Sequence, residues 1–441
     1  MRPSDHAVSG DPDVQRQLDR IKPPHPDDPL GIDAIRMLLG RLGDPQYAIP
    51  PAFHIAGTNG KGSTCAFLRA MLEAAGYRVH SYSSPHLVRV NERIRVRGSL
   101  IGDGLLAQLL GEVLDASEGL GISFFEVMTA AAFLAFAREP ADAAIIEVGL
   151  GGRLDATNVM RTPVATGIAQ LALDHQFFLG NDLCSIAAEK AGIAKAGVPL
   201  VTMDYPGSVA DVVGRTARSA GAVWLPRAKS WSSQVKGGVA YRDDLGSLDL
   251  PMPSLAGVHQ AENAALAVAM LRHQSRLPVA EHALCAGITT ATWPARLQPL
   301  GSGPFTTRVR AVEGEIWLDG GHNPSAGDML RRHFFEGGMR PHSLTVILAM
   351  LAGKDAQGFI AAVAPLIAHL HAVPLAGQQC HPSDYLAKLA AIEGVPATAH
   401  SSLDAAISAL GSEDRRPGAM LIAGSLHLAG EILQLNQQAA A

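Results

Sequence analysis

The chain has 441 residues, of which 47% are hydrophobic and 17% are charged. This length and composition predict two or three globular domains and exclude a disordered protein. The formal net charge of -5 excludes the strongly basic surface that nucleic-acid-binding proteins use.

The cysteines and the N-terminal segment indicate the compartment. Cys65, Cys184, Cys285 and Cys380 form no CxxC pair and no set with the spacing of zinc ligands, which is typical of a reducing environment. Residues 1–29 are polar and rich in proline and aspartate, so we expect a tail or loop there and no ordinary signal peptide. No apolar run reaches the ~18 residues of a membrane-spanning helix. We therefore expect a cytoplasmic protein without a membrane partner.

The elements predicted after residue 31 alternate between helices and strands. A helix at residues 32–42 precedes a strand at 52–56 and a helix at 63–75 whose apolar side chains share one face. Further strands are predicted at residues 143–148, 164–168, 198–203 and 222–225, and a strong amphipathic helix at 259–271. This alternation favours an α/β fold with a mostly parallel sheet covered by helices.

A stretch containing proline and glycine at residues 299–304 marks the start of a smaller α/β region. Strands are predicted in it at residues 316–318, 344–350 and 420–423, and a helix at 403–410. We expect an N-terminal domain over residues 1–295 and a C-terminal domain over residues 296–441.

The strongest chemical signal is the octamer Gly57-Thr58-Asn59-Gly60-Lys61-Gly62-Ser63-Thr64, between a predicted strand and a predicted helix. Glycines let backbone N–H groups turn toward phosphate oxygens, while the helix N-terminus and Lys61 add positive charge. Ser63 or Thr64 can offer a hydroxyl to Mg²⁺. The spacing is shorter than G-x-x-x-x-G-K-[ST], and an ordinary glycine-rich turn is the alternative. The flanking strand and helix favour phosphate binding.

Glu147, His175 and Lys190 form the next signals. Glu147 ends an apolar strand, where an α/β sheet presents its ligand site and a carboxylate can hold Mg²⁺. A solvated strand end is the alternative, but the apolar neighbours imply burial, and a buried unpaired carboxylate is costly. His175 follows the next strand, where a lone histidine is more often structural than a metal ligand. Lys190 lies on an apolar helix face, where the ordinary interpretation is a snorkelling or paired lysine.

Weaker polar clusters are His259-Gln260 with Asn263, Pro294 with Arg296, and the segment from Asp319 to Pro324. For Asp319 and Asn323, a capping or turn role is the ordinary interpretation.

Together these segments resemble the folylpolyglutamate synthase and dihydrofolate synthase family, which is related to the Mur ligases. The matching segments run in family order over nearly the whole chain, at residues 54–63, 83–87 with 91–94, 125–126, 147–158, 173–175 with 179–180, 189–193, 319–324 and 424–425. The resemblance implies an ATP-dependent carboxylate–amine ligase. It also implies a P-loop N-terminal domain, a smaller Rossmann-like C-terminal domain, and ATP in the cleft between them.

The resemblance also implies roles for single residues. The octamer would bind the ATP phosphates, and the other ATP-binding positions are Asn263, Arg296, Asp319 and His322. Two Mg²⁺ ions would be held by Ser63, Glu147, His175 and Lys190, the last as N6-carboxylysine, a carbamate that turns a cation into an anion near the metal. The expected catalytic set is Lys61, Glu147, His175 and Lys190. A pterin pocket would be lined by Ser84, Pro85, His86, Ser123, Phe125, Asp155 and Ala156, with Phe125 placed to stack on the pterin.

The implied reaction phosphorylates the carboxylate of dihydropteroate or of a reduced folate, after which the amine of L-glutamate attacks the acyl phosphate. We expect both synthase activities, as in bacterial bifunctional members, in a monomer. A synthase that only extends folates, a Mur-type ligase and a non-ligase nucleotide switch stay open. About 50 residues before the P-loop strand leave too little room for the UDP-sugar domain of a Mur ligase.

Two positions depart from the family pattern. The Asp319-Gly320-Gly321-His322 segment has a glycine where the family often has alanine, and Ala295 stands before Arg296 where the family usually has glycine. Both changes exchange one small residue for another and remove no functional group.

Overall fold

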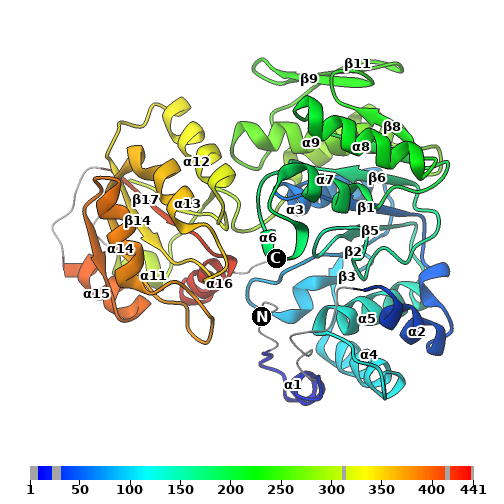
Figure 1. The fold of residues 1–441 in the computed structure, drawn as a ribbon, viewed down its shortest axis with the longest axis horizontal. Coiled ribbons are helices and arrows are strands. Elements are labelled where there is room, and N and C mark those ends of the chain that lie inside the picture. Colours follow the sequence, from blue (N-terminus) through cyan, green and yellow to red (C-terminus); the bar gives the residue numbers. More distant parts are fainter. Residues whose placement is uncertain (1–7, 22–30, 310–313, 413–417, 439–441) are drawn as a thin grey trace. The chain divides into compact units, whose positions relative to one another are not determined.

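The computed structural model describes residues 8–21, 31–309, 314–412 and 418–438. The chain divides into two compact units, both drawn in Figure 1. The first comprises residues 1–172, 176–254 and 259–292, and the second comprises residues 173–175, 255–258 and 293–441. Each unit contains its own sheet and its own hydrophobic core.

A large, mostly parallel sheet forms the centre of the first unit. Its strands are β1 (Ala52–Ala56), β2 (Val79–Tyr82), β3 (Ile94–Val96), β4 (Ser99–Leu100), β5 (Ala143–Glu147), β6 (Ala165–Ile168), β7 (Pro199–Thr202) and β8 (Val223–Pro226). They lie in the order β4-β3-β2-β5-β1-β6-β7-β8, with antiparallel pairing only between β2, β3 and β4 in the described sheet. The central strands β1 and β5 are buried along their whole length, as expected for a parallel sheet covered on both faces.

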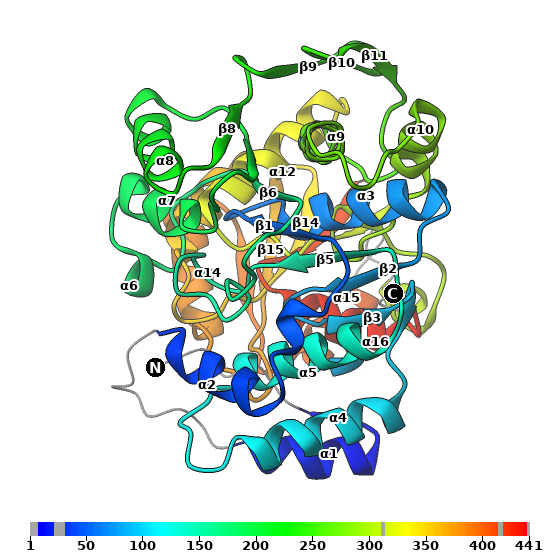
Figure 2. The same cartoon turned by 90° about the vertical axis from the view of Figure 1, so that its right-hand side faces the viewer.

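Helices cover both faces of this sheet. They are α1 (Pro12–Leu18), α2 (Asp33–Arg41), α3 (Lys61–Ala74), α4 (Asp103–Ala116), α5 (Phe124–Arg138), α6 (Gln176–Leu179), α7 (Leu183–Ala191), α8 (Gly207–Ser219), α9 (Val258–Arg272) and α10 (Glu281–Thr290), with short 3₁₀ turns η1 (Pro45–Tyr47) and η2 (Val90–Arg93). Helix α3 packs against β1, β2 and β5, whereas α5 packs against β2 and β3. Figure 2 shows α3 and α5 on opposite faces of the sheet.

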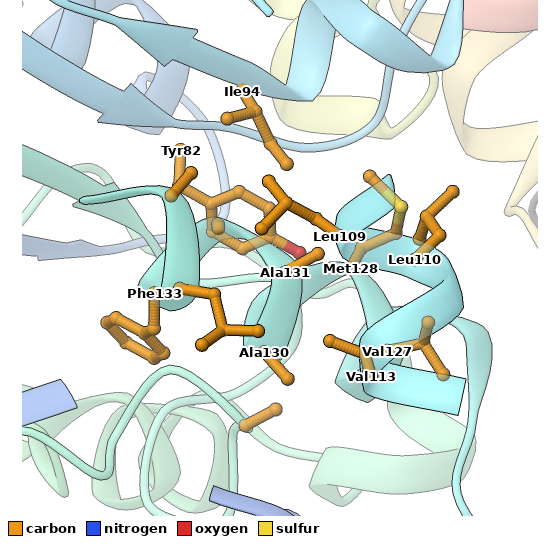
Figure 3. Close-up of a cluster of buried hydrophobic side chains, with 14 of the residues drawn as sticks. Tyr82, Ile94, Leu109, Leu110, Val113, Val127, Met128, Ala130, Ala131 and Phe133 are labelled. Carbon is orange, nitrogen blue, oxygen red and sulfur yellow. The ribbon is translucent and has the colours of Figure 1, made fainter. Parts of the chain in front are cut away.

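A hydrophobic core lies between the sheet and helices α4 and α5 (Figure 3). Its labelled members are Tyr82 and Ile94 from the sheet, Leu109, Leu110 and Val113 from α4, and Val127, Met128, Ala130, Ala131 and Phe133 from α5. The alanines of α5 let this helix approach its neighbours closely, so it is buried on nearly every side. Within this group, Thr129 Oγ1 and the Tyr82 hydroxyl lie 3.1 Å apart in a hydrogen bond.

Helix α1 lies where the sequence predicted a tail or loop over residues 1–29, and that prediction was wrong for α1. Residues 1–7 and 22–29 lie outside the described residues. The aspartate before α1 accepts two backbone N–H groups of the first turn. Val14 and Leu18, one helical turn apart, are buried, and α1 packs against α4. This spacing behind an Asp-Pro start was the signal that the sequence analysis missed.

Helix α9 is buried along nearly its whole length, so the prediction of a strong amphipathic helix was wrong about its environment. Residues 263–271 are buried without a break, because many of them are alanines that leave room for close packing. A side chain at Gly167 of β6 would overlap Met270, which shows how tightly α9 sits on the sheet.

A small antiparallel sheet, β9 (Trp231–Val235), β10 (Val239–Asp243) and β11 (Gly246–Leu250), was not predicted. It is anchored to α9 through Asp243, whose fully buried side chain accepts hydrogen bonds from Arg272 Nε and Nη2 at 2.7 Å each. The Tyr241 hydroxyl donates to the same carboxylate at 2.9 Å. Alternating burial along β10 is the period-two pattern that would have indicated a strand.

The second unit contains a mixed sheet in the order β12-β13-β17-β14-β15-β16. Its strands are β12 (Gln298–Pro299), β13 (Ile316–Leu318), β14 (Leu344–Leu348), β15 (Ile367–Ala372), β16 (Ala397–Ala399) and β17 (Ala419–Ala423), and its helices are α11 (Pro304–Arg308), α12 (Pro324–Glu336), α13 (Ala356–Val363), α14 (Ser383–Ile392), α15 (Leu403–Ser412) and α16 (Leu426–Leu435), with η3 (Ala364–Leu366). Helices α12, α13 and α14 bury the core cluster against β14 and β15.

The predicted α/β fold class is confirmed, and most predicted elements match observed ones within two residues. Strand β1 coincides with its prediction, and α3 begins two residues before its predicted start because Gly60 serves as the N-cap. In the part of the chain that the structure describes, no helix is long and apolar enough to cross a membrane.

The buried histidine of β1 predicts a pH-dependent stability. Burial, helped by Lys195, lowers the pKa of His54 from 6.5 to about 3. As the pH falls below 6.5, His54 binds a proton in the unfolded chain but stays neutral in the folded chain, so stability is lost between pH 6.5 and about 3. Between pH 7 and pH 5 the free energy of unfolding should fall by about 2 kcal/mol more in the wild type than in His54→Gln, which cannot titrate.

Urea unfolding followed by circular dichroism at the two pH values measures this difference. The same loss in both proteins would contradict a neutral, buried His54.

Candidate functional site

The loop after β1 forms the N-terminus of α3. Gly57 has φ 151° and Gly60 has φ 87°, both in the region that favours glycine, and a Cβ at Gly60 would overlap Asn263 Oδ1 of α9. The N–H groups of Thr58 and Asn59 donate to Gln170 O at 2.8 and 3.2 Å. Helix α3 has no side-chain cap, so its first-turn N–H groups are the ones presented for an anion.

The two hydroxyls of the octamer have different surroundings. Thr64 Oγ1 donates to Gly60 O at 2.9 Å, within the helix. Ser63 is 1% exposed, and among the described residues its Oγ has no hydrogen-bond partner. A buried hydroxyl without a partner is costly unless a ligand completes it. Ser63 is therefore the hydroxyl that fits a metal or phosphate.

Two lysines converge on the carbonyl oxygen of Gly57. Lys61 Nζ donates to Gly57 O at 3.0 Å and to Thr58 O at 3.3 Å. Lys190 Nζ, from α7, donates to the same Gly57 O at 2.9 Å, and its residue is 4% exposed. The lysine on an apolar helix face is thus a buried lysine whose ammonium group lies at the phosphate loop.

Glu147 ends β5, next to Ile55 of β1, and is 3% exposed, as its apolar neighbours predicted. Its Oε2 accepts the N–H of Ser84, in the loop after β2, at 3.3 Å. Burial raises the pKa of the Cys65 thiol in α3, and the Glu147 charge raises it further. The carboxylate therefore lies near both the first turns of α3 and the loop after β2.

The positions expected to line a pterin pocket have varied surroundings. The Phe125 ring lies against Gly149, where a Cβ would overlap it, and 5.8 Å from the Tyr82 ring. Ser123 caps α5 in a capping box with Glu126, so its hydroxyl has a structural partner. Ala156 is buried in the core cluster of α4 and α5.

The loop after β2 brings an unpredicted arginine to the predicted residues Ser84, Pro85 and His86. Arg93 is fully buried, and its Nε donates to His86 Nδ1 at 2.9 Å. Its guanidinium also lies 5.1 Å from the centre of the Phe124 ring. Residues 91–94 are part of the resemblance to the family, but no role was predicted for Arg93.

Asp155 belongs to a buried polar group that the sequence analysis missed in part. Its Oδ2 accepts Leu150 N at 2.9 Å, and its Oδ1 accepts both Thr157 N at 3.0 Å and the Thr157 hydroxyl. His54 Nε2 lies 2.8 Å from Thr157 Oγ1. Burial raises the pKa of Asp155, against the hydrogen bonds that lower it.

In the second unit, Asp174 gathers three polar partners. Its Oδ1 accepts Lys354 Nζ at 2.6 Å, and its Oδ2 lies 3.2 Å from His322 Nε2. Lys354 Nζ is also 3.4 Å from His175 Nε2. Burial alone would raise the pKa of the Asp174 carboxyl, but these neighbours hold it well below its usual range. Lys354 and Asp174 had no predicted role; Gly353-Lys354-Asp355 after a strand was the available signal.

Asp319 holds together the segments that carry Arg296 and His322. Its oxygens accept Leu297 N at 2.8 Å and Gly321 N at 2.7 Å, so the turn role is confirmed. Burial raises the pKa of Asp319, although the nearby Arg296 charge acts to lower it. Burial also lowers the pKa of His322, whose Nδ1 lies 3.0 Å from Gly320 O. Asn323 caps α12, as the ordinary interpretation expected.

One departure from the family pattern affects the backbone. Ala295 has φ 55°, in the left-handed region that favours glycine, so replacing glycine with alanine is a conformational change as well as one of size. The residue type alone did not predict this effect, because it depends on the backbone conformation at position 295.

The residues expected to bind ligands lie in both units. The first unit contains the loop after β1, Glu147, Lys190, Asn263 and the positions expected to line a pterin pocket, and the second contains His175, Arg296, Asp319 and His322. In the described ranges, no three His, Cys, Asp or Glu side chains are arranged to hold a metal ion on their own. The expected metal set contains only one Glu and one His, together with a hydroxyl and a lysine.

The chain matches none of the protein-family models. It is 34% identical over 410 residues to the dihydrofolate synthase/folylpolyglutamate synthase of Escherichia coli, covering 92% of this chain and 91% of that protein.

Solved structures agree with this similarity. Escherichia coli FolC in complex with DHPP and ADP superposes with a TM-score of 0.84 at 31% identity, covering 97% of this chain and 98% of that one. A bifunctional folylpolyglutamate synthase/dihydrofolate synthase with Mn, AMPPNP and L-glutamate bound gives a TM-score of 0.80 at 32% identity, covering 93% and 95%. This chain belongs to the dihydrofolate synthase/folylpolyglutamate synthase family of ATP-dependent ligases.

Proposed function

We propose that this chain adds L-glutamate to dihydropteroate, making dihydrofolate, and to reduced folates, with ATP as co-substrate in both reactions. The observation that carries the proposal is the loop after β1, where an uncapped helix N-terminus, the Lys61 ammonium group and the buried Ser63 hydroxyl lie within one helical turn. The ADP, AMPPNP, DHPP and L-glutamate bound in related structures support it.

The phosphates of ATP would bind at the N-terminus of α3. The N–H groups of Lys61, Gly62 and Ser63 are those of its first turn, and the helix dipole favours an anion there. Asn263 lies against Gly60 and would contact the bound nucleotide from α9. Arg296 and His322 would bind ATP from the second unit, with Asp319 holding their two segments together through its hydrogen bonds to Leu297 and Gly321.

The residues present fit magnesium. Ser63 offers a buried hydroxyl and Glu147 a buried carboxylate, which are hard oxygen ligands of the kind that Mg²⁺ prefers. Ser63, Glu147, His175 and a modified Lys190 would be the residues that hold the ions. Bound Mg²⁺ would offset the negative charge of the phosphates during transfer.

A carbamate on Lys190 fits its surroundings better than an ammonium group does. Lys190, which is buried, and Lys61, which is half-buried, both donate to Gly57 O, so two cations lie close together there. Carbamylation removes one of these positive charges and supplies an anion for a metal. The carbamate nitrogen keeps one N–H, so the hydrogen bond to Gly57 O can survive the modification.

The reaction needs positioning and charge neutralisation more than a covalent nucleophile. The acceptor carboxylate attacks the γ-phosphorus of ATP, ADP leaves, and an acyl phosphate forms. The amine of L-glutamate then attacks the acyl carbon, loses a proton, and expels inorganic phosphate as the amide bond forms. Lys61 and the first turn of α3 would hold the transferring phosphate while its charge shifts.

The pterin acceptor would bind on the side of the loop after β2. Phe125 presents a ring, packed on Gly149, that can stack on a pterin, and Asp155 presents a buried carboxylate for its N–H groups. Ser84, Pro85 and His86 belong to the loop that also donates to Glu147, which links the acceptor site to the metal site. Ser123 and Ala156 would line the pocket mainly with backbone atoms and by their small size. The Ser123 hydroxyl is used in the cap of α5, and Ala156 belongs to the hydrophobic core.

Replacing Lys61, Glu147 or His175 with alanine should lower kcat/KM at least 100-fold, because each removes charge or metal binding at the transferring phosphate. Steady-state release of phosphate measures the loss, and circular dichroism checks folding. Lys388→Ala is the matched control, since this lysine of α14 is exposed and, among the described residues, forms an ion pair only with Asp384 one turn earlier in the same helix. Normal turnover in all three variants would refute the assignment.

The two synthase activities are tested by phosphate release in Mg²⁺, ATP and L-glutamate with dihydropteroate in one assay and tetrahydrofolate in another. We expect release in both, each dependent on L-glutamate. Release with tetrahydrofolate alone would make the enzyme a folylpolyglutamate synthase only. Release with neither would favour a Mur-type ligase or a nucleotide switch.

The modification of Lys190 is tested in crystals grown with bicarbonate, where we expect electron density for a carboxylate group beyond Nζ. Lys190→Ala should lose at least 100-fold in kcat because the second metal loses a ligand. Density that ends at Nζ in metal-bound crystals would show that Lys190 acts as an ammonium group.

A further inference from the structure

A buried chain of three polar side chains joins the central strand to the acceptor site. His54 lies on β1, and Thr157 and Asp155 lie in the turn after β5. His54 and Thr157 are fully buried and Asp155 is 5% exposed. His54 Nε2 lies 2.8 Å from Thr157 Oγ1, which in turn donates to Asp155 Oδ1. The three groups thus form one continuous path of hydrogen bonds through the core.

The positions of the protons along this path follow from the chemistry of the groups. An ionised carboxylate only accepts hydrogen bonds, so the single hydroxyl proton of Thr157 is given to Asp155. His54 must then donate its Nε2–H to the Thr157 oxygen, which leaves Nδ1 without a proton. Among the described residues, Nδ1 is buried without a hydrogen-bond partner, as suits the unprotonated nitrogen of this tautomer. The lowered pKa of His54 agrees with a neutral ring.

We propose that His54 is a positioning residue for the pterin acceptor: through Thr157 it fixes the orientation of the Asp155 carboxylate. This inference rests on the proposed function of Asp155 as a pterin-binding group. The backbone N–H groups of Leu150 and Thr157 hold one oxygen each, and the Thr157 hydroxyl is the side-chain donor in this set. A hydroxyl can rotate, and His54 sets the direction in which it donates.

A purely structural role accounts less well for these contacts. His54 sits between Phe53 and Ile55 in a strand whose burial favours apolar side chains, and burying an imidazole there costs free energy. The β1 backbone is held by its ladders to β5 and β6, which do not use the imidazole. The path from His54 leads to Asp155, while the loop proposed to bind phosphate begins three residues further along the chain, after the end of β1. The structure therefore assigns the imidazole to the acceptor and not to ATP.

The test compares KM values for dihydropteroate, tetrahydrofolate and ATP in single variants of this path. His54→Leu removes the donor, and we expect KM for both acceptors to rise about tenfold, the effect of one lost hydrogen bond to a charge-bearing group. KM for ATP and kcat should stay within about twofold. His54→Gln places an amide N–H at the reach of Nε2 and should restore the acceptor KM.

Two further variants keep the test decisive if His54→Leu does not fold. Thr157→Val should raise the acceptor KM like His54→Leu, while Thr157→Ser, which keeps the hydroxyl, should not. The double variant His54→Leu/Thr157→Val should be no worse than Thr157→Val alone, because both act on one path.

Several outcomes would overturn the proposal. They are an unchanged acceptor KM in Thr157→Val and His54→Leu, an equal rise in KM for ATP, or additive effects in the double variant. Asp155→Asn separates this failure from that of the proposed function. If Asp155→Asn raises the acceptor KM and the His54 and Thr157 variants do not, only the positioning role fails. If the wild type releases phosphate with neither acceptor, the proposed function itself fails.

Discussion

The carbonyl oxygen of Gly57 accepts hydrogen bonds from two ammonium groups, Lys61 at 3.0 Å and Lys190 at 2.9 Å. Like charges this close repel, and Lys190 is buried while Lys61 is half-buried, so the arrangement favours an anionic partner. In the proposed function, the anions near these two lysines are Glu147 on the neighbouring strand and the phosphates of ATP, and a carbamate on Lys190 would remove one of the two positive charges. Three elements of the first unit position these groups. The Gly57 carbonyl follows β1, helix α3 begins with Lys61, and α7 carries Lys190.

Strand order explains why these groups meet. Strand β1 lies between β5 and β6, although the chain passes through β2, β3 and β4 before it reaches β5. The carboxyl ends of parallel strands therefore bring together segments that are about 90 residues apart in the chain, as the pairing of Ile55 with Glu147 shows. Glycine at positions 57 and 60 lets the chain turn sharply beside Ala169 and Asn263 without a clash.

The sequence predicted what depends on local patterns and missed what depends on distant ones. Strand β1, the octamer and buried Glu147 were predictable because apolar runs, glycine spacing and the cost of a buried charge are visible along the chain. The choice between Ser63 and Thr64 was not, because it depends on which hydroxyl bonds to Gly60 O. The link from His54 to Thr157 spans 103 residues, and no periodicity indicates it. The left-handed backbone conformation at Ala295 was not predictable, because an alanine in the sequence does not indicate a positive φ.

In the proposed function, strand β1 contributes to two ligand sites by two different means. Its backbone leads directly into the phosphate loop and is fixed by hydrogen-bonded neighbours on both sides. The side chain of His54 acts on the other ligand, because it contacts Thr157, which donates to the Asp155 carboxylate that is expected to bind the pterin. Because a ladder depends on peptide groups and not on side chains, the acceptor site can be tuned at His54 while the phosphate loop keeps its geometry. A ligase that uses one nucleotide with more than one acceptor benefits from this separation, since the two sites share a strand without sharing the groups that recognise their ligands.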